Sequence, residues 1–196
     1  MSVERQSRAR AGRIPPGELH LRVAGHGELK VRVFDNDGRM RADAILEISS
    51  ALRDRRLDVV RTMEPRLVAM LYLVGQHYDA PLNVVSGYRQ RGITATEGSR
   101  HGAANACDFY VDGVGVRSLA RTIEGMFANV GVGYYPRSGF VHLDSRRRTY
   151  YWIDNSGPGQ RSRTRTRSIE VAANPADDVT LRSVHVTEQE LYIPPP

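Results

Sequence analysis

The chain has 196 residues, of which 40% are hydrophobic, and it carries a formal net charge of +6. This length and apolar content suit one domain with short extensions. No run of 18 or more apolar residues occurs, which excludes a transmembrane helix, and the single cysteine excludes an internal disulfide. Residues 1–12 show no signal peptide, so we expect either a cytoplasmic protein or export directed by an upstream segment.

The positive charge is concentrated near the two ends of the chain. Residues 1–13 carry +3 and residues 161–167 carry +4, which leaves −1 for the rest of the sequence. A nucleic-acid-binding domain needs its basic residues on a folded face, so we expect no nucleic-acid partner. The basic segments either contact anionic polymers such as cell walls or have no partner.

Composition divides the chain into three segments. A basic segment predicted to be disordered covers residues 1–16, a folded domain covers 17–155, and an Arg- and Pro-containing tail covers 156–196. Within the tail, residues 181–193 either add a strand or remain loose.

Within the folded domain, hydrophobic periodicity predicts helices and short strands in chain order. The predicted helices cover residues 42–55, 63–78 and 116–127, and the predicted strands cover 29–34, 82–85, 105–111, 130–135 and 139–143. For the second helix, Thr62 is the predicted N-cap and Pro65 lies in the first turn. This order favours an α+β fold with a small antiparallel sheet, helices packed on one face and a metal site on the other.

Strand parity predicts which side chains share the open face of that sheet. Alternate side chains of a strand point to the same face, so Asp108 of the strand 105–111 lies opposite its apolar neighbours. In the strand 139–143 and its continuation, His142 and Asp144 share one face. His101, on the loop that enters the first strand, can reach over them.

Two histidines and one carboxylate leave a fourth position on a tetrahedral zinc for water, which is typical of a catalytic site. Iron(II) or manganese can bind the same ligands. The alternatives are a solvent-exposed loop histidine for His101, a hydrogen-bonded strand-end histidine for His142, and an ion pair with Arg89 for Asp108. The carboxylate needs some partner, because a buried unpaired charge costs several kcal/mol.

Several ordered motifs resemble the D-Ala-D-Ala metallopeptidase superfamily, which includes the hedgehog fold, and look most similar to its branch of periplasmic murein endopeptidases. The resemblance covers residues 29–152. It rests on Ser86-Gly-Tyr-Arg89, Ser99-x-His101 with Ala106-x-Asp108, Gly131-Val-Gly-Tyr-Tyr-Pro136 and Phe140-Val-His142-Leu-Asp144.

The resemblance implies a zinc ion (Zn2+) held by His101, Asp108 and His142, and an Arg89 that stabilises the substrate carbonyl or the tetrahedral intermediate. It implies hydrolysis of peptide bonds in peptidoglycan stem peptides or cross-links, in the periplasm or another extracytoplasmic place. For Arg89 the alternative is an ion pair with Asp108 or Asp144. A non-catalytic zinc-containing module that binds peptidoglycan or a protein is the alternative function.

The sequence departs from the family at the general base. Related branches carry Glu or His where this chain has Gly139 and Phe140. Asp144 is the candidate base, and an outer carboxylate that orients a ligand imidazole is the alternative role. Tyr135 is a candidate hydrogen-bond donor to the intermediate and substrate, with a packed aromatic as the alternative.

Three further departures concern the backbone and the loops. Ala104 replaces an expected glycine, which is tolerable unless the backbone there needs a positive φ. The loop from Arg89 to Ser99 is short, and residues 145–148 (Ser-Arg-Arg-Arg) replace a Gly-rich turn. The short loop leaves the substrate preference open.

Overall fold

The structure, a computed structural model, describes residues 13–166. Its helices in this range are α1 (Ala42–Ala51), α2 (Pro65–Tyr78), the short 3-10 helix η1 (Arg100–Ala103) and α3 (Val116–Met126). Its strands are β1 (Glu18–Val23), β2 (Gly27–Arg32), β3 (Leu82–Ser86), β4 (Ala106–Val111), β5 (Val130–Tyr135), β6 (Phe140–Ser145), β7 (Tyr150–Asp154) and β8 (Thr164–Thr166). Residues 1–12 of the segment 1–16, which was predicted to be disordered, and the possible strand 181–193 lie outside the described residues.

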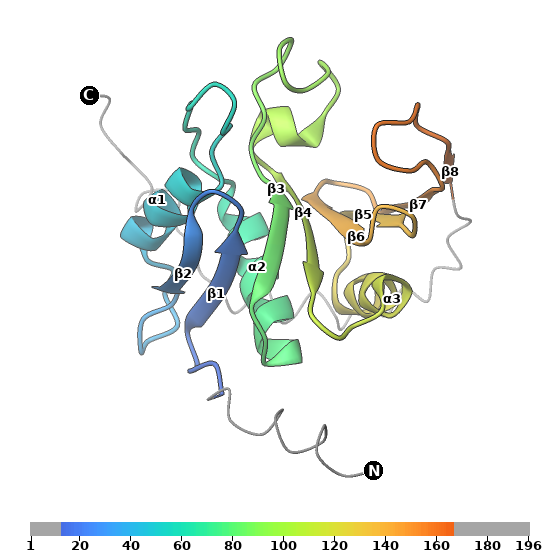
Figure 1. Ribbon diagram of the computed structural model, residues 1–196. Helices are drawn as coiled ribbons and strands as arrows, with labels where there is room; N and C mark the ends of the chain where they lie inside the picture. The colour runs from blue at the N-terminus through green and yellow to red at the C-terminus, as the bar shows by residue number, and fades with distance from the viewer. Residues whose placement is uncertain (1–12, 167–196) are drawn as a thin grey trace, which may run out of the picture.

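The strands form one sheet in the order β2-β1-β3-β4-β6-β5-β7-β8 (Figure 1). Five neighbouring pairs are antiparallel, whereas β1 with β3 and β5 with β7 are parallel. The α+β class is confirmed, but the prediction of a small antiparallel sheet was wrong, because the sheet is mixed and has eight strands. Periodicity finds strands without giving their direction, and β1, β7 and β8 were not predicted.

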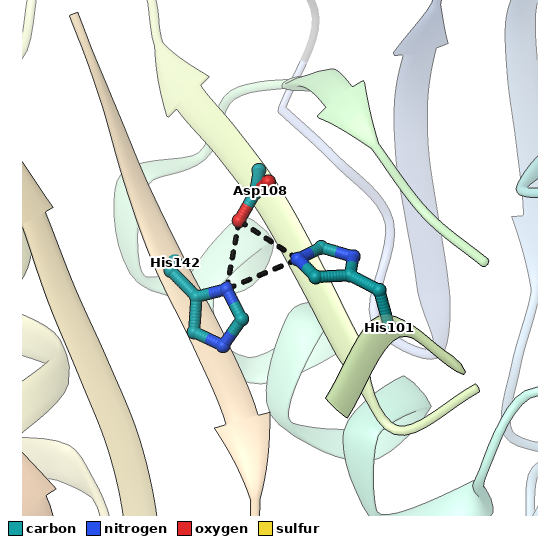
Figure 2. A group of neighbouring side chains, drawn as sticks. All are labelled: His101, Asp108 and His142. Atoms are coloured by element: carbon teal, nitrogen blue, oxygen red, sulfur yellow. Dashed lines mark hydrogen bonds and ion pairs between the residues drawn. The ribbon is translucent and has the colours of Figure 1, made fainter. Parts of the chain in front are cut away.

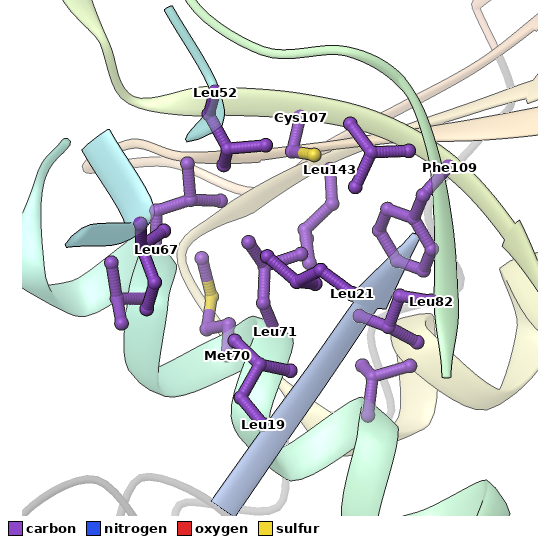
Figure 3. Packing of buried hydrophobic residues seen from close by; sticks show 14 of the residues in the cluster. Leu19, Leu21, Leu52, Leu67, Met70, Leu71, Leu82, Cys107, Phe109 and Leu143 are labelled. Carbon is purple, nitrogen blue, oxygen red and sulfur yellow. The ribbon is translucent and has the colours of Figure 1, made fainter. Parts of the chain in front are cut away.

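The helices and one face of the sheet enclose the core. Side chains of β4 and β6 such as Cys107, Phe109 and Leu143 are fully buried, in one cluster with Leu71 of α2 and Leu119 of α3 (Figure 3). Burying one such side chain contributes about 1.5–3 kcal/mol. The helical layer on one face leaves the opposite face of β4 and β6 free for polar groups. The longest described helix has 14 residues, and none in this part of the chain could cross a bilayer.

Helix α2 begins differently from the sequence-based expectation. Its N-cap is Glu64, whose side chain accepts a hydrogen bond from the backbone N–H of Leu67 at 3.0 Å. Thr62 therefore does not cap the helix. Pro65 occupies the first helical position, where its missing N–H costs nothing, so the cap must be the residue directly before it.

Two glycines of β5 leave space on the open face of the sheet for side chains of the neighbouring strands. A Cβ at Gly131 would lie 2.2 Å from Oδ2 of Asp144, and one at Gly133 would lie 2.5 Å from the Trp152 ring. Real Cβ atoms do not approach other atoms so closely, so the missing side chains let a carboxylate and an indole lie across the sheet. This gives the glycines of the Gly131-Val-Gly133 motif a structural reason.

The segment after β7 continues the sheet. Strand β8 pairs with β7, and the side chain of Asp154 accepts hydrogen bonds from Ser156 N (2.8 Å), Ser162 Oγ (2.6 Å) and Arg163 N (3.1 Å). These bonds hold the pKa of the Asp154 carboxyl below its usual value although burial opposes the shift. The described part of the predicted tail, up to residue 166, is therefore attached to the domain.

Candidate metal centre

Three polar side chains meet on the open face of the sheet. Asp108 on β4 and His142 on β6 are direct register partners in adjacent antiparallel strands. Such partners have Cβ atoms about 5 Å apart on one face. His101 comes from η1, which lies just before β4. The structure therefore brings together the three residues that the sequence predicts as ligands.

Their potential ligand atoms form a tight triangle (Figure 2). Oδ1 of Asp108 lies 2.8 Å from Nδ1 of His142 and 3.2 Å from Nε2 of His101, and the two ring nitrogens are 3.1 Å apart. One ligand atom from each residue lies within 4.8 Å of the others. All three side chains are buried. Two imidazoles and one carboxylate match the donor set of catalytic zinc sites, so these residues fit a divalent metal.

Each imidazole is oriented by a contact at the ring nitrogen that does not belong to the triangle. Nδ1 of His101 lies 2.7 Å from the carbonyl oxygen of Gly87, and Nε2 of His142 lies 2.9 Å from Oδ2 of Asp144. A histidine that donates one N–H to such an acceptor presents its other nitrogen as a ligand. The candidate ligand atoms are therefore Nε2 of His101 and Nδ1 of His142.

A guanidinium completes the support of His142. Arg146 donates through Nε to Oδ1 of Asp144 at 2.6 Å and through Nη2 to Oδ2. Its guanidinium also lies over the rings of Tyr150 (5.4 Å) and Trp152 (5.6 Å). Sequence reasoning did not single out Arg146. The signal was Asp144 itself, because a fully buried carboxylate requires a cation or several donors.

Aromatic rings lie next to His142 at the candidate metal centre. The Trp152 ring lies 5.0 Å from the His142 ring, centroid to centroid, and its Nε1 donates to the hydroxyl of Tyr135 at 3.1 Å. Tyr135 also stacks on Phe140 at 4.5 Å. Burial raises the pKa of the Tyr135 hydroxyl, against the effect of the Trp152 hydrogen bond. Tyr135 is thus a packed aromatic that also lines the cleft, and its hydroxyl accepts the Trp152 hydrogen bond.

Arg89 lies next to the candidate metal ligands without a close ion pair. Its Nη2 is 4.0 Å from Oδ2 of Asp108, and its side chain is 39% exposed. Within residues 13–166, its buried Nε has no hydrogen-bond partner. The backbone N–H of Arg89 donates to the carbonyl of His101 at 3.3 Å, which fixes the two residues relative to each other.

The site faces a cleft of about 430 Å³. Its lining includes the three candidate ligands together with Arg89, Tyr135, Arg146 and Trp152. The triangle of ligand atoms is thus open to molecules on one side, which a purely structural metal site does not require.

The electrostatics of the triangle favour a charged carboxylate. Burial alone would raise the pKa of Asp108, but the two neighbouring histidines hold it well below its usual range. Burial likewise opposes protonation of His142, yet hydrogen bonds to Asp108 and Asp144 raise its pKa to about 9. In the metal-free protein His142 therefore carries a proton at neutral pH, and a metal must displace it.

This donor set at an open cleft fits a metal centre of the kind that metallopeptidases use. The family model for peptidoglycan L,D-endopeptidase MepK matches residues 13–149. The chain belongs to this family, a branch of the M15 metallopeptidases, which confirms the resemblance seen in the motifs.

Curated relatives agree with the family match. Peptidoglycan L,D-endopeptidase MepK of Escherichia coli strain K12 is 31% identical over 144 residues, covering 66% of this chain and 77% of the relative. The protein of the same name from Shigella flexneri gives the same values. The probable peptidoglycan L,D-endopeptidase MepK of Haemophilus influenzae is 31% identical over 106 residues, covering 48% and 56%. Solved structures give no significant match.

Proposed function

We propose that this metallopeptidase uses zinc to hydrolyse peptide bonds of peptidoglycan, with the L,D bond of cross-links as the substrate bond. The observation that carries the proposal is the convergence of one ligand atom each from His101, Asp108 and His142 at the edge of an open cleft. The printed names of the relatives supply the bond type. Peptidoglycan lies outside the cytoplasm, so we place the enzyme there as well.

In this proposal the chain contributes the metal ligands, a group that binds the oxyanion and a carboxylate that orients one ligand ring. When bound, zinc polarises a carbonyl and lowers the pKa of water toward neutrality. Arg89 is the group that we assign to the developing oxyanion, because its guanidinium reaches the cleft and is not held in a close ion pair. Tyr135 is positioned at the same cleft to donate a hydrogen bond to substrate.

For Asp144 the contacts support the orienting role over the role of general base. Its Oδ2 accepts from His142 and its Oδ1 accepts from Arg146, and the residue is fully buried. A carboxylate whose two oxygens are both occupied by fixed donors is a poor acceptor for a proton from water. We therefore assign Asp144 to hold the ring of His142 in place.

The direct test combines metal analysis with digestion of purified cross-linked muropeptides. We expect about one zinc per chain and cleavage that a chelator abolishes and zinc restores. Cleavage that survives complete removal of metal would exclude the proposed mechanism. Loading the stripped protein with manganese or iron(II) in parallel decides whether zinc is the metal that supports the fastest turnover.

One observation favours a non-catalytic binding module as the second candidate. The positions that carry the base in related branches are Gly139 and Phe140 here, and among the described residues Asp108 is the carboxylate that lines the metal cleft. A binding module would hold zinc and bind muropeptides while releasing no product. The digestion experiment separates the two candidates.

A further inference from the structure

A second hollow, of about 780 Å³, adjoins the metal cleft at the connection between β6 and β7. The two hollows share Arg100, Arg146 and Tyr150, so they lie next to each other. We call the second hollow the arginine basin, after the lining residues Arg66, Arg100, Arg146, Arg147 and Arg148. Three of these arginines lie in the 145–148 segment, where the resemblance predicts a Gly-rich turn.

Two of the five arginines have structural partners. Arg66 donates to the backbone carbonyls of Ala128 (2.7 Å) and Asn129 (2.9 Å). Arg146 is bound to Asp144. These two guanidinium groups already make hydrogen bonds within the protein, so they have few donors left for a ligand.

The other three arginines have no such role. Across residues 13–166 the structure gives the side chains of Arg100, Arg147 and Arg148 no hydrogen bond or ion pair, and all three are exposed. The acidic residue in the described lining is Glu64, and its Oε2 accepts from Leu67 N (3.0 Å) and Ser145 Oγ (2.6 Å). Several unpaired cations around one hollow create a positive potential that attracts anions.

A further hollow, which shares Arg89 with the metal cleft, also contains arginines. It measures about 690 Å³ and includes Arg53 and Arg55. Arg53 pairs with Asp58, and Arg55 donates to the carbonyl of Ala24. Within the described residues, two of the four arginines that line that hollow have such partners, against two of five in the arginine basin, and Asp54 adds a carboxylate to the lining of that hollow.

We propose that the arginine basin is a subsite that binds a free carboxylate of the substrate peptide while the bond to be cut lies in the metal cleft. The inference rests on the peptidase function proposed above. A guanidinium binds a carboxylate through two parallel hydrogen bonds. Arg100 lines both hollows and directly precedes the ligand His101, so a peptide at the metal passes it on entering the basin.

The test compares a cross-linked muropeptide with its amidated form, in which the free carboxylates are carboxamides. Binding is measured by calorimetry in the presence of a chelator, so that it does not depend on turnover, and kcat/KM is measured with zinc. The variant is the double substitution Arg147→Gln and Arg148→Gln. The matched control is Arg117→Gln with Arg121→Gln, which removes the same charge from exposed positions of α3 on the opposite face.

We expect the wild-type protein to bind the acidic form roughly tenfold more tightly than the amidated form, the size of one charge-assisted contact. The basin variant should bind both forms alike, and the control should keep the preference. Equal binding of both forms by wild type, a preference that survives in the basin variant, or preferential binding of a phosphodiester polymer would overturn the subsite. Selective binding without cleavage would instead support the subsite and exclude the peptidase function.

Discussion

The carboxylate of Asp144 lies 2.9 Å from Nε2 of His142, and the opposite ring nitrogen lies 2.8 Å from Asp108. One imidazole thus connects an outer carboxylate to a candidate metal ligand. Arg146 extends this connection by holding Asp144 from its other side. The orientation of the ligand ring is therefore set by an ion pair that does not itself enter the ligand triangle.

Replacing Asp144 with Asn tests this connection. Removing the negative charge weakens the hold on His142 and leaves Arg146 without a counter-ion, so zinc affinity should fall about 10- to 100-fold. Competition with a chromogenic chelator measures the change, with the exposed Asp112→Asn as control. Unchanged zinc affinity combined with lost turnover would instead identify Asp144 as the general base.

The substitution His142→Ala should abolish both zinc binding and muropeptide cleavage, because it removes one of the three proposed protein ligands. Elemental analysis and product detection by chromatography measure the two effects. His77→Ala is the matched control, since that histidine is exposed on α2 and lies outside the candidate metal group. Full activity of the His142 variant would contradict the proposed mechanism.

Zinc affinity should rise with pH. The metal-free protein holds a proton on His142 up to a pKa of about 9, and zinc must displace it, so the affinity should increase about tenfold per pH unit between pH 7 and 8. The raised pKa stabilises the metal-free fold fully below the unfolded value of about 6.5, and this contribution is lost as pH rises through 9. As the pH rises, the zinc affinity measured by chelator competition should increase, whereas the melting temperature of the metal-free protein should fall. A zinc affinity that does not change with pH would contradict the assignment of a displaced proton to His142.

Gly133→Ala tests the close approach of Trp152. The new Cβ would lie 2.5 Å from the indole, a rigid ring that must move, so we expect a loss of about 1–3 kcal/mol in unfolding free energy and reduced turnover. Gly125→Ala in α3 is the matched control, because its Cβ meets nothing within 4 Å and alanine favours the helix over glycine by up to about 1 kcal/mol. Chemical denaturation compares the two, and equal stability would show that the indole can shift freely.

The positions of the candidate ligands were predictable because strand parity and the family motifs agree. Asp108 and His142 share a face because the apolar alternation of each strand sets them opposite its buried side chains, and the sheet pairs the two residues directly. The helices around the core were predicted to within a few residues because their apolar periodicity is strong.

The surroundings of the site were not predictable to the same extent. Trp152 reaches His142 because β7 lies parallel beside β5, and a parallel pairing leaves no local signal in the sequence. Arg146 was noted only as part of a basic segment. Ala104 adopts a φ of +56°, so the position where the family has glycine does need a left-handed backbone here. That conformation costs a non-glycine residue roughly 1 kcal/mol, which burial of its methyl group offsets.

A conservative substitution of Arg89 distinguishes between its two possible roles. Arg89→Lys keeps the positive charge but loses the planar fork of donors. If the guanidinium stabilises the oxyanion, kcat should fall about 100-fold while zinc content and melting temperature stay the same. If Arg89 serves instead as the partner of Asp108, 4.0 Å away, the variant should lose zinc affinity or stability along with activity. Kinetics, elemental analysis and thermal unfolding on one preparation separate these outcomes, and a variant with normal kcat would remove Arg89 from the mechanism.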